Sequence, residues 1–98
     1  MEEWKFTDPK NVAVFTTQSV VKVHQQILFV YHDEEDGSWQ FHHEIDPNEK
    51  EALVVGLSEI VEIDQSVNEL ADLPIGWTAQ RDSKSKPWQR KKNQVRAV

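Results

Sequence analysis

The sequence predicts an α+β fold, with a mainly antiparallel sheet of about five strands and two or three short helices on one face. Strand-like segments outnumber helical ones, short turns join successive strands, and the helical segments fall between strands. The length of 98 residues is typical of one domain. We place this domain at residues 1–81 and expect a basic, partly mobile C-terminal tail over residues 82–98.

An irregular arm precedes the first predicted strand. Residues 1–10 show little periodicity and contain a proline, so we expect an arm that packs through Trp4 and Phe6. Residues 11–16 are rich in β-branched and aromatic side chains, which favours a strand. Thr17 is then suited to cap a short helix, because its hydroxyl can accept a hydrogen bond from the first turn.

Residues 27–41 predict a β-hairpin. The apolar run over residues 27–31 has the length of a strand, and an acidic loop follows it. Gly37 ends this loop, where it can adopt the left-handed conformation that tight hairpins need. The second strand alternates strictly, which places on one face Trp39 and Phe41, and on the other Ser38, Gln40 and His42.

The second half of the chain predicts two more strands with short helices between them. Residues 52–56 form a continuous apolar run, which we interpret as a central strand. A helical pattern follows, and Ser66 with Glu69 matches the capping box of a further short helix. A last strand is expected over residues 77–81, with Trp77 directed inward.

Charge is distributed unevenly along the chain. Residues 1–80 contain 16 Asp/Glu and 4 Lys/Arg, whereas residues 81–98 contain seven Lys/Arg and one Asp. The first segment therefore carries −12 and the second +6, which together give the net charge of −6. Such a basic tail either binds an anionic partner or folds back on its own acidic body. Folding back costs less, because the attached tail is always near the acidic surface.

Several classes of protein find no support in the sequence. The chain has no cysteine, which excludes disulfides, thiolate metal sites and thiol nucleophiles. Its three glycines are too far apart for a phosphate-binding loop, and no nucleophile motif is present. The longest apolar run is too short to span a membrane, and the acidic N-terminal residues do not resemble a secretion signal. We therefore expect a cytoplasmic protein without a cofactor.

The four histidines provide one candidate for metal chemistry. His32 and His42 lie on strands that are predicted to pair, with Asp33 or Glu34 nearby, but their spacing matches no specific zinc or iron pattern. The acidic loop at residues 33–37 lacks the ligand spacing of a calcium loop. We expect neither a metal site nor an enzyme. A small metal-dependent hydrolase that uses the two histidines is a third hypothesis.

The sequence favours a protein-binding module that engages its partner through an acidic face. Acidic surface attracts cationic proteins, and tryptophan is enriched at binding hot spots. The candidate contact residues are Asp33, Glu34, Glu35, Asp36, Trp39 and Trp77. Self-association through an exposed strand edge is also open.

The alternative function is nucleic-acid association through the tail. Its candidate residues are Trp88, which would stack on bases, and the cations Arg90, Lys91 and Lys92, which would attract phosphate. The charge of −12 on the remaining chain opposes this alternative, because it repels a phosphate backbone.

Two tryptophan-bearing motifs resemble those of a known family. They are Asp-Glu-Glu-Asp-Gly-Ser-Trp-Gln-Phe at residues 33–41 and Leu-Ala-Asp-Leu-Pro-Ile-Gly-Trp-Thr-Ala at residues 70–79, with Val-Val-Gly-Leu at residues 54–57 between them. This pattern resembles a family of small uncharacterised bacterial proteins, in which a "DG-W-F" hairpin and a "DLP-G-W-A" turn recur at similar spacing. That family in turn resembles the immunity proteins of polymorphic toxin systems. The resemblance covers about residues 11–90 and carries no catalytic residue. It implies a small α+β domain that neutralises a toxin by occupying its basic surface.

Overall fold

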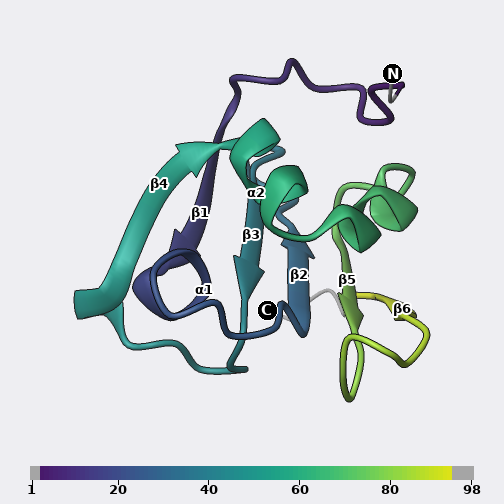
Figure 1. Ribbon diagram of the computed structural model, residues 1–98. Coiled ribbons are helices and arrows are strands. Elements are labelled where there is room, and N and C mark those ends of the chain that lie inside the picture. The colour runs from purple at the N-terminus through teal and green to yellow at the C-terminus, as the bar shows by residue number, and fades with distance from the viewer. Residues whose placement is uncertain (1–2, 94–98) are drawn as a thin grey trace.

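The structure, a computed structural model that describes residues 3–93, is built on a six-stranded mixed sheet (Figure 1). Its strands are β1 (Ala13–Thr17), β2 (Phe29–His32), β3 (Trp39–His42), β4 (Ala52–Gly56), β5 (Trp77–Gln80) and β6 (Gln89–Lys92). They lie in the order β4-β1-β3-β2-β5-β6. Neighbouring strands are antiparallel except β1 and β3, which are parallel. The predicted α+β class is confirmed, whereas the sheet has one strand more than expected and is mixed.

Short helices cover one face of the sheet. They are α1 (Gln18–Val21), α2 (Leu57–Ile63) and the 3-10 helix η2 (Gln65–Leu70), which lie in front of the strands in Figure 1. A further 3-10 turn, η1 (Glu49–Glu51), leads into β4. The core lies between the sheet and these helices. It consists of Phe6, Val14, Val20, Ile27, Val30, Trp39, Phe41, Leu57, Ile60, Val61, Val67, Leu70, Leu73 and Ala79.

The other side of the sheet, which we call the open face, is lined by the side chains that alternate with the core residues. The strand register aligns one row of them across all six strands. From β4 to β6 the row is Val54, Phe15, Gln40, Tyr31, Thr78 and Lys91. Its β4 end is apolar and accessible, since Val54 is 60% and Phe15 41% exposed. Its β6 end carries a cation.

The predicted hairpin and N-terminal arm are confirmed. Strands β2 and β3 pair in antiparallel fashion, and Gly37 in the connecting turn has a φ of 71°. In the arm, the Phe6 ring meets the Trp39 ring edge-on, with 5.3 Å between centroids. The Trp39 indole N–H donates to the Asp8 carboxylate at 2.7 Å, and the Trp4 indole N–H donates to the Asp8 carbonyl at 2.8 Å. These bonds fix the arm against the end of the sheet.

Two local predictions are wrong. Strand β4 lies at the edge of the sheet and not at its centre, with Val55 packed against the core and Val54 60% exposed. Ser66 does not cap η2. The cap is Asp64, whose carboxylate accepts hydrogen bonds from the backbone N–H and the hydroxyl of Ser66.

The basic segment assigned to the tail contributes the sixth strand. All four side chains of β6 are exposed, so they form no apolar stripe that would reveal a strand in the sequence. The strand is held instead by backbone pairing with β5, in which Ala79 lies opposite Arg90. The sheet therefore extends past the domain boundary expected at residue 81. Residues 94–98 of the expected tail lie outside the described residues.

Transmembrane helices were not expected from the sequence. In the part of the chain that the structure describes, no helix has the length and apolar character needed to cross a membrane.

Candidate functional site

A groove with a volume of about 340 Å³ lies on the open face over β1 and β3, and we call it the β1–β3 groove. It extends from the hairpin turn to the β3–β4 connection, residues 43–51. Carboxylates, neutral polar groups and apolar side chains all contribute to its lining. The lining residues are Asp33, Asp36 and Glu49, then Thr16, Thr17, Ser38, Gln40, His42 and Asn48, and finally Phe15, Pro47 and Ala52.

Hydrogen bonds hold the carboxylates of the hairpin turn in place. Oδ2 of Asp33 accepts from the Gln40 amide at 2.7 Å and from the Ser38 hydroxyl at 3.4 Å. Oδ1 of Asp36 accepts from the Ser38 hydroxyl at 2.8 Å and from the Ser38 backbone N–H at 3.0 Å. The hydroxyl bond and then the backbone bond lower the pKa of Asp36 from its ordinary value. The turn therefore presents preorganised negative charge to the groove.

His42 brings a buried imidazole to the groove lining and is only 5% exposed. The Gln40 NH₂ group donates to Asp33, so the other end of the amide, Oε1, faces Nε2 of His42 at 2.9 Å. Because this oxygen can only accept, Nε2 carries the proton and Nδ1 is an acceptor. Nδ1 is buried and has no hydrogen-bond partner among the described residues. Burial lowers the pKa of His42 despite the opposing charge of Asp33, which keeps the ring neutral at neutral pH.

The negative charge of the protein is concentrated around this groove. Residues 33–36 carry four carboxylates, and residues 44–51 carry four carboxylates and one lysine. The two segments together carry −7, whereas the whole chain carries −6, so the rest of the chain sums to +1. Residues of both segments line the groove. Three of these eight carboxylates, those of Asp33, Asp36 and Glu49, line the groove itself, and no lysine or arginine does.

The structure divides the predicted contact residues between two faces of the sheet. Asp33 and Asp36 line the groove, and Glu34 and Glu35 are exposed on the same turn. Trp39, in contrast, points to the helix-covered face and is 2% exposed. Trp77 is half-buried and packs against the core. Strand alternation directs Trp39 into the core and leaves little of its ring for a partner, whereas Trp77 keeps partial exposure and its contact with a partner stays a prediction.

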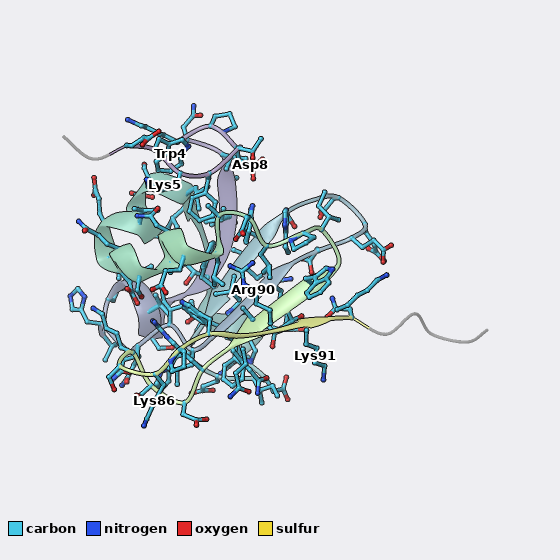
Figure 2. The ribbon with its side chains drawn as sticks, turned by 90° about the vertical axis from the view of Figure 1, so that its right-hand side faces the viewer. Trp4, Lys5, Asp8, Lys86, Arg90 and Lys91 are labelled. Atoms are coloured by element: carbon cyan, nitrogen blue, oxygen red, sulfur yellow. The ribbon has the colours of Figure 1, made fainter. Side chains whose placement is uncertain are left out.

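Two of the four predicted tail residues, Trp88 and Arg90, contact the acidic body. Trp88 is half-buried, and the Arg81 guanidinium lies 3.9 Å from the centroid of its ring. Arg90 donates to the Glu69 carbonyl at 2.6 Å and to the Asp72 carboxylate at 2.7 Å. Arg90 and Lys91 project to opposite sides of β6 (Figure 2). Lys91 and Lys92 are exposed.

The link between the basic segment and the body depends on a buried ion pair. Arg81 donates to Asp64 at 2.7 Å, and the two side chains are only 1% and 5% exposed. Arg81 also donates to the Ile27 carbonyl at 3.0 Å and to the Ser66 hydroxyl at 2.9 Å. Burial raises the pKa of Asp64, but the bonds from Ser66 and the charges of Arg81 and Lys84 outweigh burial, so the pKa is lowered overall. In the described residues, the basic segment thus folds back on its own protein.

The two histidines of the metal hypothesis do not face each other. The register pairs His32 with Trp39 and His42 with Phe29, which places the two imidazoles on opposite faces of the sheet. The His32 ring stacks on Trp39 with 3.8 Å between centroids, and its Nδ1 lies 2.7 Å from the Leu73 carbonyl. Between residues 3 and 93, no group of three or more His, Cys, Asp or Glu side chains could hold a metal ion. The geometric basis of the metal-dependent hydrolase hypothesis is therefore lost.

Of the groove residues outside the hairpin turn, the sequence singles out His42 alone, as a candidate metal ligand. Phe15 could have been found, because it alternates with Val14 and Thr16 and must face away from the core. Its neighbour Gln40 could not, because nothing local in the sequence indicates that β1 pairs in parallel with β3. Comparison of the chain with protein-family models, curated protein sequences and solved structures gave no match. The function must therefore be argued from the geometry of the groove.

Proposed function

We propose that the protein is a binding module that engages a cationic protein partner through the β1–β3 groove. The observation that carries this proposal is the concentration of charge, since the two segments that border the groove carry −7 and the rest of the chain +1. Charge of one sign around a concave surface steers an oppositely charged partner and accelerates its association.

Accessible apolar surface beside the groove supports a protein partner over a small cation. Phe15 lines the groove at 41% exposure, and Val54 lies directly opposite it on β4 at 60% exposure. Protein interfaces commonly combine an apolar centre with a polar rim. The acidic turn and the β3–β4 connection would form such a rim around these side chains.

The chemistry of the groove agrees with the partner that the motif resemblance implies. A basic toxin domain presents the positive charge that an acidic groove requires, so an immunity-like role is the finer form of this proposal. A second copy of this chain is a weaker match. A second copy would offer the exposed Lys91 and Lys92 of β6 to the groove. Its net charge of −6 would at the same time repel the equally charged first copy.

Nucleic-acid association through the basic segment has less support from the contacts. Arg81 and Arg90 are engaged by Asp64 and Asp72, which leaves fewer cations to neutralise phosphates. Lys91 lies on the open face, and that face also bears the acidic groove. Phosphate that approached Lys91 would therefore meet a repulsive field.

Binding of a fluorescent peptide in which arginine alternates with glycine tests the proposal. We expect the peptide to bind at low salt and to be released as salt is added, because exposed charges are screened. The double variant Asp36→Asn/Glu49→Gln should weaken binding roughly twofold to tenfold, since two charges are lost at the groove. Anisotropy titrations measure both effects.

A matched control separates the groove from net charge. Glu62→Gln/Glu69→Gln removes the same charge from exposed residues of α2 and η2, on the helix-covered side. This variant should bind the peptide nearly as the wild-type protein does. Equal weakening by both double variants, or no binding at low salt, would contradict the proposal. Stronger binding of an oligonucleotide than of the peptide would instead favour the nucleic-acid alternative. Self-association would be favoured if sedimentation without peptide showed dimers of the wild-type protein and monomers of the groove variant.

A further inference from the structure

We infer that the β1–β3 groove receives one arginine side chain of the cationic partner, with its guanidinium stacked on Phe15 and hydrogen-bonded to the carboxylates of the groove. The inference rests on the proposed function and specifies the residue that the groove recognises. Three features of the lining lead to it: an accessible aromatic ring, a set of acceptors, and a buried imidazole nitrogen without a partner.

Phe15 offers an aromatic face to the groove. The register places it beside Gln40 on β3, and the Gln40 amide in turn donates to Asp33 at 2.7 Å. The ring and the first carboxylate are therefore connected through one intervening side chain on the same face. An aromatic ring attracts a cation placed over its face, and a planar guanidinium stacks there with its N–H groups directed outward. A guanidinium above Phe15 would thus direct its donors to the groove walls.

The charged groups that the lining offers to a ligand are all carboxylates. Asp33, Asp36 and Glu49 provide carboxylate oxygens, and the hydrogen bonds to the two aspartates within the described residues engage only one oxygen of each. Two buried polar atoms of lining residues, Nδ1 of His42 and Oγ1 of Thr16, have no hydrogen-bond partner in residues 3–93. Leaving a buried polar atom unpaired costs free energy, and a guanidinium N–H that reached either atom would remove this cost.

Arginine matches this set of acceptors better than lysine does. A guanidinium carries five N–H donors in one plane and no acceptor, whereas an ammonium is a compact and strongly hydrated point charge with three donors. Only the planar group can stack on a ring and bind a carboxylate through two parallel bonds at the same time. The groove volume of about 340 Å³ lies at the lower end of the range for ligand pockets, about 300–1,000 Å³, which suits a single side chain.

The test compares two peptides and two variants. The fluorescent peptide of alternating arginine and glycine is titrated beside its lysine counterpart, at equal charge and equal salt. We expect the arginine peptide to bind about two- to fivefold more tightly, and Phe15→Leu to remove most of this preference, because the ring is lost while the residue stays apolar. The control Val23→Ala truncates an exposed apolar residue that does not line the groove and should leave the preference unchanged.

A competition experiment with a single residue completes the test. N-acetyl-arginine methylamide should displace the labelled peptide at lower concentration than its lysine analogue does, and should do so less effectively from Phe15→Leu. If both peptides bind equally and Phe15→Leu changes nothing, the arginine inference is overturned while the proposed function stands. If neither peptide binds, or if Asp36→Asn/Glu49→Gln binds as the wild type does, the proposed function fails as well. The comparison of peptides on the wild-type protein requires no variant to fold.

Discussion

Two ion pairs of equal length allow the contribution of burial to be measured. Arg81 to Asp64 and Arg90 to Asp72 both measure 2.7 Å, but the Asp64 side chain is 5% exposed and the Asp72 side chain 81%. Asp64→Asn preserves the shape of the side chain and removes its charge, which leaves a buried guanidinium without its counter-ion. Breaking a buried pair in this way costs about 3–5 kcal/mol. This is a large share of the total of about 5–15 kcal/mol that is typical of small domains.

The matched substitution Asp72→Asn should change stability very little, since solvent and salt already weaken an exposed pair. Urea unfolding followed by tryptophan fluorescence measures both changes, and the four tryptophans of the chain provide the signal. We expect a large fall in the midpoint for Asp64→Asn and a midpoint near that of the wild type for Asp72→Asn. Equal shifts for the two variants, or a negligible shift for Asp64→Asn, would refute the claim that the basic segment is held to the body by a buried charge.

Three further predictions concern the stability of the sheet. Burial lowers the pKa of His42, so below about pH 6.5 the unfolded state binds a proton that the folded state does not. The free energy of unfolding should therefore fall as pH decreases below about 6.5. In the His42→Gln variant, the free energy of unfolding measured against pH should lack this part of the decrease. An unchanged pH dependence in that variant would exclude His42 as its source. Gly37→Ala should lower the free energy of unfolding in urea by about 1–2 kcal/mol, because φ at this position is 71°. An added Cβ would make only an ordinary contact of 3.7 Å with Ile75, so the cost comes from the backbone conformation. A cost near zero would show that the turn relaxes. Asp8→Ala leaves the buried Trp39 indole N–H without its acceptor and should cost about 1–3 kcal/mol, measured by the same method; a fully preserved midpoint would mean that the N–H finds another partner.

Strand faces could be predicted from the sequence because they depend only on local alternation. Alternation predicts Trp39 and Phe41 on one face and Gln40 and His42 on the other, and the structure confirms this assignment. Gly37 was assigned correctly for a similar reason, since a tight hairpin requires a residue that accepts a positive φ.

Strand neighbours could not be predicted in the same way. The parallel pairing of β1 with β3 joins segments that are separated by α1 and β2, and no local pattern encodes it. The floor of the groove therefore did not follow from the sequence. Strand β6 was missed for another reason: its position depends on backbone pairing with β5 and on the stacking of Arg81 over Trp88, which no apolar periodicity reveals.

The acidic part of the site was predicted better than its shape. The hairpin turn was recognised as a concentration of carboxylates, and two of its aspartates line the groove. Of the two tryptophans predicted beside them, Trp39 is a core residue and Trp77 packs against the core while partly exposed. The exposed aromatic residue of the groove is Phe15 instead.

A map of backbone amide chemical shifts during titration of the labelled wild-type protein with the arginine–glycine peptide tests the central claim most directly. The account predicts that the changes at low salt concentrate in β1, in β3, in the hairpin turn and in the β3–β4 connection, which together border the acidic groove. Changes confined to α2 and η2, or to β6, would place the interaction elsewhere and contradict the account.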